Sequence, residues 1–310
     1  MIIGQTWEPS GGQDDVMTPL EYFATLVAQP DDGEDIPLTE AALAIAQDIE
    51  PRLDLAATQS QIDRLAATLK ARLPADAGQV HKLRLLNRYF FHELGFAGNA
   101  NDYYDPDNSY LSKVLDRRRG IPISLAVLFM EIGQQIGLPL RGVPFPGHFL
   151  VKLKVRAGDI YLDPFSGESL SRERLEERLA EFLEAMQSGV TSDGASDRID
   201  RGALDIALGS AIREATPREI LARMLRNLKA VYHGRNDYAR LLEVQKRLVI
   251  LLPDEPEEIR DRGLVYAQLE CPRAALDDLT AYLEAAPSAA EADEIRRTLD
   301  ILRDASGRLN

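Results

Sequence analysis

The stretch that decides the fold reads Arg117-Arg-Arg-Gly-Ile-Pro-Ile-Ser-Leu-Ala-Val-Leu-Phe-Met-Glu131. Pro122 follows a glycine turn and suits the first position of a helix, because its missing N–H is not needed there and its φ is already helical. From Pro122 to about Ile136, apolar residues fall on every side of the expected helix, which is typical of a helix buried in a domain core. Ser124 is the polar side chain in its first turn. Its hydroxyl is either a satisfied core or capping group, or a nucleophile.

The composition is that of an ordinary globular protein. The chain has 310 residues, of which 45% are hydrophobic and 28% charged, so two domains with their own cores are expected. A net charge of −14 argues against nucleic-acid binding, which needs Lys and Arg to neutralise phosphates. It also argues against binding to anionic membrane surfaces. No apolar run approaches the roughly 18 residues of a spanning helix.

Cysteine and histidine usage predicts the compartment and argues against a metal centre. Cys271 is the one cysteine, so no intramolecular disulfide can form. The N-terminal residues also lack the pattern of a signal peptide, and we therefore expect a cytoplasmic protein. The spacing of the histidines matches no zinc motif, so we expect neither a metal nor another cofactor. They are His81, His92, His148 and His233.

Hydrophobic periodicity divides the chain into segments. Residues 1–37 are expected to be irregular except for a short helix at Pro19 to Val27, and 191–215 form a polar connector. Residues 38–190 should form a mostly helical α+β domain, because the period changes from 3.6 to 2 after the central helix and back again. The other helices expected there are one from Thr39, Ser60–Leu73, Ala77–Leu94, Ser109–Arg118 and Ser171–Met186. The expected strands are Leu140–Val143, His148–Val155 and Ile160–Asp163, and they form a small antiparallel sheet.

The C-terminal part, residues 216–310, repeats with a period of 34. Tyr232 is matched by Tyr266 and Pro253 by Pro287, and this period with paired helices is the tetratricopeptide pattern. The expected helices are 217–233, 238–252, 256–269 and 273–286, with 289–304 as a capping helix. Two repeats are fewer than the roughly three needed for independent stability, so the array should pack against the first domain.

Three side chains could form a catalytic arrangement. Ser124 lies at a helix start, where N–H groups and the helix dipole favour a developing negative charge. His148 on a strand could act as a general base, and Asp163 on the next strand could fix its tautomer. A buried His–Asp pair can equally be a structural hydrogen bond.

The hairpin between the two strands decides whether His148 meets Asp163. A tight turn at Ala157-Gly158 places Asp163 opposite Lys152, which is four residues from His148 and about 13 Å away at strand rise. Direct pairing is then expected only with a looser loop that covers roughly residues 153 to 158. In either case His148 and Asp163 point to the same face.

Seven short motifs stand out between residues 104 and 264. They are Tyr104-Asp-Pro-Asp-Asn-Ser-Tyr-Leu111, Arg118-Arg-Gly-Ile-Pro-Ile-Ser-Leu125, Leu138-Pro-Leu-Arg-Gly-Val143, Pro146-Gly-His-Phe-Leu-Val151, Leu162-Asp-Pro-Phe165, Arg226-Asn-Leu-Lys-Ala-Val-Tyr232 and Asp261-Arg-Gly-Leu264. Together these motifs resemble the SirB-type invasion-regulator family, in which a transglutaminase-like domain precedes tetratricopeptide repeats. The similarity covers roughly residues 40 to 300.

The resemblance implies a papain/transglutaminase-like helical domain with a small antiparallel sheet, followed by an α-helical array of repeats. The superfamily, which includes papain-like amidases and acyltransferases, uses a Cys at the helix start and then His and Asp on strands. By position, Ser124 takes the Cys place, His148 the His place and Asp163 the Asp place. A thiol at a helix N-terminus becomes a thiolate at neutral pH, whereas a serine hydroxyl depends on its base. Cys271 lies in a repeat and cannot substitute.

Two functions remain open from the sequence. The first is a regulatory or scaffold protein with a catalytically retired domain, which binds a peptide or protein partner through its groove and repeat helices. The second is a Ser-His-Asp hydrolase or acyltransferase that acts on an amide or ester. The fold does not choose between them, and the partner, the substrate and the oligomeric state are not specified by the sequence.

Overall fold

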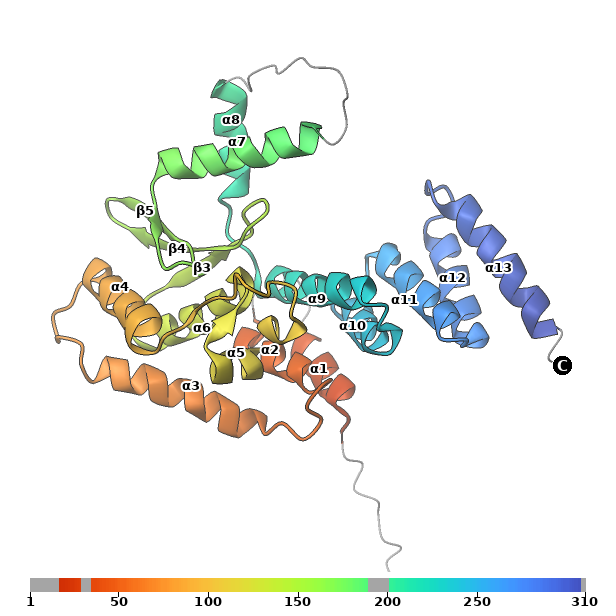
Figure 1. Ribbon diagram of the computed structural model, residues 1–310, viewed down its shortest axis with the longest axis horizontal. Helices are drawn as coiled ribbons and strands as arrows, with labels where there is room; N and C mark the ends of the chain where they lie inside the picture. The colour runs from red at the N-terminus through yellow and green to blue at the C-terminus, as the bar shows by residue number, and fades with distance from the viewer. Residues whose placement is uncertain (1–16, 29–34, 189–200, 308–310) are drawn as a thin grey trace, which may run out of the picture.

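The computed structural model describes residues 17–28, 35–188 and 201–307 (Figure 1). The predicted helix Pro19–Val27 is confirmed. The rest of the segment that was expected to be irregular (1–16 and 29–34) and residues 189–200, which include the start of the connector, lie outside the described residues. Within the described connector, a helix that the sequence did not reveal spans Arg201–Ala211.

The chain folds as the predicted mostly helical α+β protein. The helices of the first part are α1 (Pro19–Val27), α2 (Leu38–Ala46), α3 (Leu55–Lys70), α4 (Gln79–Asn87), the π-helical η1 (Arg88–Glu93), the 3-10 turn η2 (Pro106–Asn108), α5 (Leu111–Arg117), α6 (Pro122–Gln135), α7 (Arg172–Ser188) and α8 (Arg201–Ala211). The strands are β1 (Ala97–Gly98), β2 (Arg119–Gly120), β3 (Leu140–Val143), β4 (Leu150–Val155), β5 (Gly158–Leu162) and β6 (Ser169–Leu170). In the described residues, no helix is long and apolar enough to cross a membrane.

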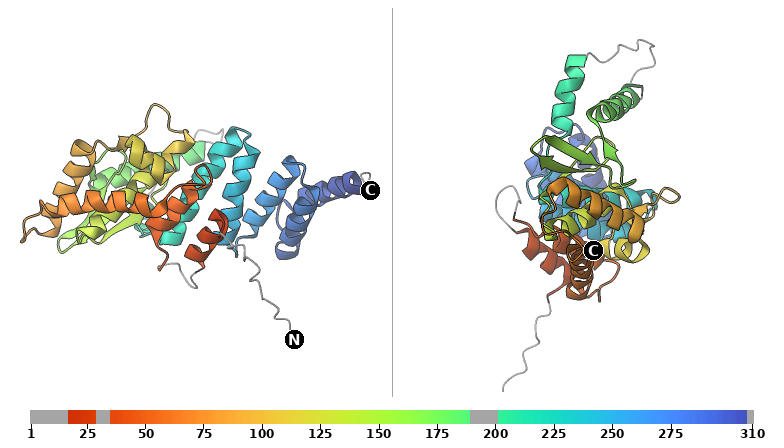
Figure 2. Two further views of the ribbon diagram at one scale, coloured as in Figure 1. Left: turned by 90° about the horizontal axis from the view of Figure 1, so that it is seen from below. Right: turned by 90° about the vertical axis from the view of Figure 1, so that its left-hand side faces the viewer.

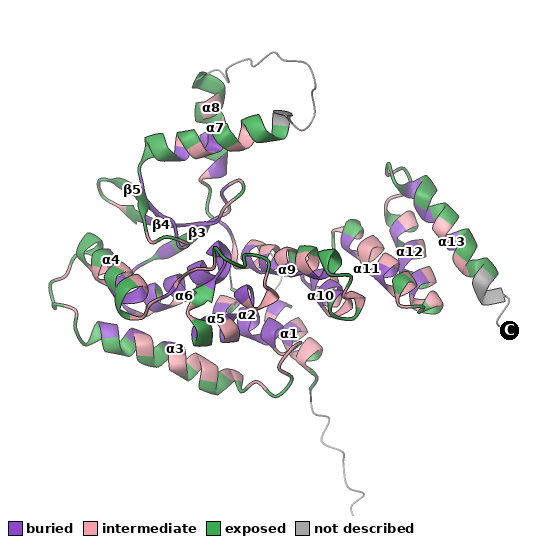
Figure 3. Ribbon diagram, in the orientation of Figure 1, coloured by how far each residue is buried: buried purple, intermediate pink, exposed green. Residues whose placement is uncertain are grey.

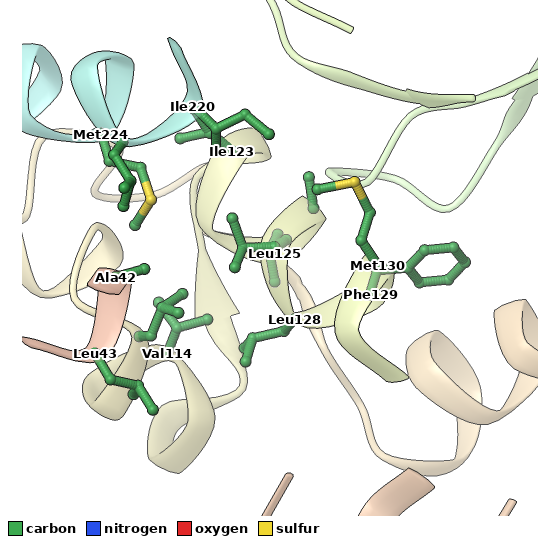
Figure 4. Packing of buried hydrophobic residues seen from close by; sticks show 14 of the residues in the cluster. Ala42, Leu43, Val114, Ile123, Leu125, Leu128, Phe129, Met130, Ile220 and Met224 are labelled. Atoms are coloured by element: carbon green, nitrogen blue, oxygen red, sulfur yellow. The ribbon is translucent and has the colours of Figure 1, made fainter. Parts of the chain in front are cut away.

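The helix at Pro122 is the centre of the core, as its all-round apolar sequence predicts. Leu125, Ala126, Leu128 and Phe129 of α6 are each 0% exposed, and Figure 3 draws most of this helix as buried. Figure 4 shows that the core-facing side chains of α6 meet α2 and α5. Ile220 and Met224 of α9 approach the start of α6 in the same view. Burying such side chains is worth roughly 1.5–3 kcal/mol each, so this helix fixes the packing of its neighbours.

The four-stranded antiparallel sheet has the order β3-β4-β5-β6 and lies between two apolar layers. Val151, Leu153 and Leu162 belong to the core cluster around α6. Leu150 and Tyr161 face the other way, into a second cluster with α7 and α8. This alternation is the period of 2 that predicted the strands. The helices α7 and α8 cover the face of the sheet that is turned away from α6 (Figure 1).

The repeat helices extend away from this body in a row (Figure 2). They are α9 (Pro217–Gly234), α10 (Tyr238–Leu251), α11 (Pro256–Gln268), α12 (Pro272–Ala285) and α13 (Ala292–Gly307). As expected for a short array, the first two helices pack on the other part of the chain: α9 contacts α2 and α6, and α10 contacts α1.

One helix predicted as continuous is interrupted. The sequence predicts a helix over 77–94, but α4 ends at Asn87 and a π-helical turn, η1, follows. Phe90 and Phe91 on this turn both contact the Phe129 ring, at 5.3 Å and 5.8 Å between centroids. The π-helical turn η1 thus carries two rings that pack on Phe129 of α6.

A buried pair of tyrosines joins the two parts of the chain. The hydroxyls of Tyr110 and Tyr232 lie 2.8 Å apart, and the residues are 1% and 2% exposed. We expect Tyr110→Phe to lower the free energy of unfolding by about 1–3 kcal/mol, because the Tyr232 hydroxyl loses its partner. The measurement is urea denaturation of the two single variants and the double variant. If the two single effects simply add in the double variant, the hydrogen bond does not stabilise the junction.

Candidate functional site

Ser124 is enclosed at the start of α6 and bonded to main-chain groups. Its Oγ lies 2.6 Å from the Asn108 carbonyl oxygen and 3.0 Å from the Ile121 carbonyl oxygen. Either oxygen can accept the hydrogen bond that the hydroxyl donates. It accepts a hydrogen bond from the Ile121 N–H at 3.2 Å. Ser124 is 0% exposed, and a Cβ on Gly120 would stand only 2.7 Å from the hydroxyl. The hydroxyl therefore caps the helix, which was the first of the two readings of its position.

Asn108 ties the loop between β1 and α5 to this helix start. Its carbonyl accepts from Ser124 and, at 3.3 Å, from the Ile121 N–H. Its side chain donates to the carbonyl of Asp102 at 2.7 Å and to that of Tyr103 at 3.2 Å, and Asn108 itself is 1% exposed. Asn108 therefore holds this loop against the start of α6.

The side chains of His148 and Asp163 are joined by a hydrogen bond. Nε2 of His148 lies 2.8 Å from Oδ1 of Asp163. The same carboxylate accepts from the Phe165 N–H at 2.9 Å and from Arg178 Nη1 at 3.0 Å, and Asp163 is 3% exposed. Burial alone raises the pKa of the Asp163 carboxyl. The hydrogen bond and electrostatic interaction with His148, and the hydrogen bonds from the Phe165 N–H and Arg178, lower this pKa below its ordinary value. Asp163 is thus held as a carboxylate.

The hairpin register differs from the prediction. Val155 pairs with Gly158 and Val151 with Leu162, so the turn is tight but lies one residue earlier, at 156–157. Asp163 consequently follows the partner of Val151 instead of standing opposite Lys152, and it is two residues closer to His148. The expectation that pairing requires a looser loop was wrong. A shift of two residues keeps every side chain on the same face, so the alternation of apolar residues could not reveal it.

The structure therefore brings together two of the three predicted site residues. The hydrogen bonds of the Ser124 side chain all involve main-chain groups of Asn108 and Ile121, and the described contacts contain none between Ser124 and His148. Arg178 was missed by sequence reasoning. The sequence feature that could have indicated a role for Arg178 is its position on α7 beside Leu179, whose side chain packs on the sheet.

A cavity of about 890 Å³ lies elsewhere, among α2, α3, α6, β3 and α9. Glu40, Glu131 and Glu214 contribute its acidic lining, and Ser124, His148 and Asp163 are not among its lining residues. Across the described ranges, no group of three His, Cys, Asp or Glu side chains is placed to hold a metal ion.

Comparison with known proteins agrees with this architecture. Residues 56–226 match the family model of the transglutaminase-like superfamily, and residues 228–300 match a tetratricopeptide repeat model. A UPF0162 protein of Xylella fastidiosa (strain 9a5c) is 40% identical over 266 residues, which cover 86% of this chain and 89% of the relative. A UPF0162 protein of Vibrio cholerae is 29% identical, covering 88% of this chain and 94% of the relative. Protein SirB1 of Salmonella typhimurium is 28% identical, covering 78% and 84%. The chain belongs to the transglutaminase-like superfamily, within the SirB-type family whose members carry tetratricopeptide repeats after that domain.

Proposed function

We propose that this protein is a regulatory or protein-interaction protein whose transglutaminase-like domain is not catalytic. In this proposal it binds a peptide or protein partner through the surface beside His148 and through the repeat helices. The observation that carries the proposal is the state of Ser124, whose hydroxyl is 0% exposed and hydrogen-bonded to main-chain groups. Tetratricopeptide arrays form extended surfaces suited to binding, which supports the same role.

The chemistry of the site supports this proposal over a hydrolase. A serine hydroxyl is a weak nucleophile unless an adjacent base takes its proton. Ser124 Oγ is engaged at 2.6 Å with a main-chain carbonyl, and the Nε2 atom of His148 is engaged with Asp163. Attack by Ser124 would first require the loss of its capping bonds. The hydrogen bond between His148 and Asp163 then serves to hold the segment before β4 and the segment after β5 together.

The proposal includes the organisation and location of the chain. We place the transglutaminase-like domain at residues 38–190, the connector at 191–215 and the repeats at 216–310, and we expect the protein to act in the cytoplasm without a cofactor. Limited proteolysis tests the boundaries, because exposed connecting segments are cut first.

Labelling with a fluorophosphonate tests whether Ser124 is a nucleophile. We expect no adduct on the intact protein, under conditions in which an active serine hydrolase is labelled fully. An adduct that forms on the wild type and disappears in Ser124→Ala would establish the hydrolase instead. A Cys variant adds a second readout: in a Cys271→Ser background, Ser124→Cys should react with iodoacetamide far more slowly than the exposed Cys271 thiol of the wild type.

Replacement of Ser124 by alanine should lower the stability of the folded protein. The Ile121 N–H loses its side-chain acceptor and the Asn108 carbonyl loses a donor, so we expect the free energy of unfolding to fall by about 1–2 kcal/mol. Urea denaturation measures this. A Ser124→Ala variant as stable as the wild type would contradict the capping role.

A further inference from the structure

A half-buried arginine on α9 has no carboxylate partner among the described residues. Arg223 lies between the core-facing residues Ala222 and Met224, and its guanidinium is 5.7 Å from the centroid of the Phe149 ring. Among the described residues, its hydrogen-bond partner is the Phe145 carbonyl, which lies 3.4 Å from Nη1. A guanidinium carries five N–H donors in a planar fork, so most of its hydrogen-bonding capacity is unused by the described residues.

Three neighbouring cations on or beside α9 are paired with carboxylates. Arg213 contacts Glu219 at 2.7 Å, and Arg226 and Lys229 contact Glu258 at 2.9 Å and 2.8 Å. By contrast, no carboxylate of the described residues lies within the 4.0 Å ion-pair distance of Arg223. The chain has 50 acidic and 36 basic residues, so acidic side chains are in excess. Buried charges are ordinarily paired, which makes an unpaired, partly buried arginine a candidate for binding an anionic group.

Arg223 lies beside the His148 segment. The Phe145 carbonyl that accepts from Arg223 also accepts from the main-chain N–H of His148 at 3.0 Å. The ring of Tyr103 lies 6.3 Å from that of Phe165, whose N–H donates to Asp163. The transglutaminase-like part and the first repeat helix therefore contribute to one surface.

Tyr103 and Arg223 each influence the pKa of the other. Burial lowers the pKa of Arg223, and Tyr103 opposes this change. Burial raises the pKa of Tyr103, and Arg223 opposes that in turn. A carboxylate arriving at Arg223 would offset the unfavourable burial of the guanidinium, which is the reason such a site favours an anion.

Two exposed aromatic rings lie on the loop between β1 and η2. Tyr103 is 42% and Tyr104 72% exposed, and their rings contact each other edge to face at 5.4 Å. The loop that carries them is held by Asn108 and by a hydrogen bond of 3.1 Å from Arg235, at the end of α9, to the Tyr104 carbonyl. Figure 3 draws much of this loop as exposed. Tyrosine and arginine are the residue types that dominate binding energy at protein interfaces.

We propose that Arg223, Tyr103 and Tyr104, here named the Arg223 patch, bind an acidic segment of a partner protein. An Asp or Glu carboxylate of that segment pairs with the Arg223 guanidinium, since the planar fork matches a carboxylate bidentately. A neighbouring apolar side chain of the segment covers the two tyrosine rings. This inference rests on the proposed function and adds the chemistry of the partner to it.

Fluorescence anisotropy with two peptide libraries tests the patch on the full-length chain. One library consists of fluorescein-labelled nine-residue peptides with Asp or Glu at the centre and randomised flanks, and the other has Asn or Gln at the centre. We expect the acidic library to bind more tightly, and Arg223→Gln to weaken that binding by about tenfold or more. Arg223→Lys should retain part of the selectivity, because lysine keeps the charge but not the fork. Tyr104→Ala should weaken both libraries.

Arg226→Gln is the matched control. It removes the same charge one helical turn away on α9, from an arginine that already pairs with Glu258, and it should leave peptide binding within about twofold of the wild type. Equal binding of the two libraries, or acid-selective binding that survives Arg223→Gln, would overturn the inference. An equal loss of peptide binding in Arg226→Gln would also overturn it, because the binding would then depend on the overall charge of the protein and not on Arg223. Thermal melting checks that each variant is folded. Fluorophosphonate labelling decides the role of Ser124 separately, so each proposal can fail without the other.

Discussion

Replacement of Arg247 by methionine is expected to lower the free energy of unfolding by about 3–5 kcal/mol near pH 7.5. Arg247 on α10 makes a 2.5 Å ion pair with Asp48 just after α2, and the two side chains are 1% and 8% exposed. Its guanidinium also lies 5.6 Å from the centroid of the Phe23 ring on α1. Methionine preserves much of the apolar volume but leaves the Asp48 carboxylate buried and unpaired, which is the costly state of a broken ion pair.

Urea denaturation of three variants separates the charge from the packing. The double variant Asp48→Asn, Arg247→Met should recover most of the lost stability, because it contains no buried charge at this site. Arg240→Met removes an exposed arginine from the same helix, paired with Asp237 at 2.7 Å, and should change stability by no more than about 0.5 kcal/mol. If Arg247→Met lowers the free energy of unfolding no more than Arg240→Met does, the ion pair does not stabilise the packing of α10 against α2.

The same pair should make stability depend on pH. Burial raises the pKa of Asp48 from 3.8 to about 6, with the Arg247 charge opposing and the Glu243 charge adding to this effect. The folded protein therefore holds the Asp48 proton more tightly than the unfolded chain does. The contribution of this group to stability is complete below about pH 4 and is lost as the pH rises through about 6, a change of about 3 kcal/mol.

The measurement compares the free energy of unfolding of the wild type and Asp48→Asn between pH 4 and pH 7.5. The difference between the two proteins should change across this range, because the asparagine variant lacks the titrating group. Asp163, whose pKa is lowered, acts with the opposite sign, since its stabilisation is lost as the pH falls below its unfolded pKa of about 4. It is present in both proteins and cancels. Parallel curves over this range would contradict the raised pKa of Asp48.

These contacts make the first repeat helices part of the transglutaminase-like core. Tyr232 of α9 reaches Tyr110, and Arg247 of α10 reaches Asp48. The match to the transglutaminase-like family model also continues to residue 226, within α9. The surface around Arg223 is consequently built on a rigid junction, which suits a binding site because little ordering is lost when a partner docks.

The sequence alone determined the elements and their order. The all-round apolar run after Pro122 predicts a central buried helix, which begins at that residue and ends at Gln135. The alternation in 148–155 predicts β4, and the 34-residue period predicts the helices of the array, which begin within about three residues of their expected positions. These features are local, because helix and strand periods are written in neighbouring residues.

Only the tertiary structure decided how distant residues meet. The hairpin turn at 156–157 pairs His148 with Asp163, since a shift of two residues changes neither face of a strand. The inward capping bonds of Ser124 depend on Asn108, sixteen residues away in the chain. Arg247 pairs with Asp48, whereas Arg223 has no carboxylate partner in the described part of the chain. Both outcomes depend on which acidic residues the fold brings within reach. A periodic sequence pattern specifies which face of a helix or strand is buried. Which side chains contact each other across that face is decided only when the helices and strands pack together.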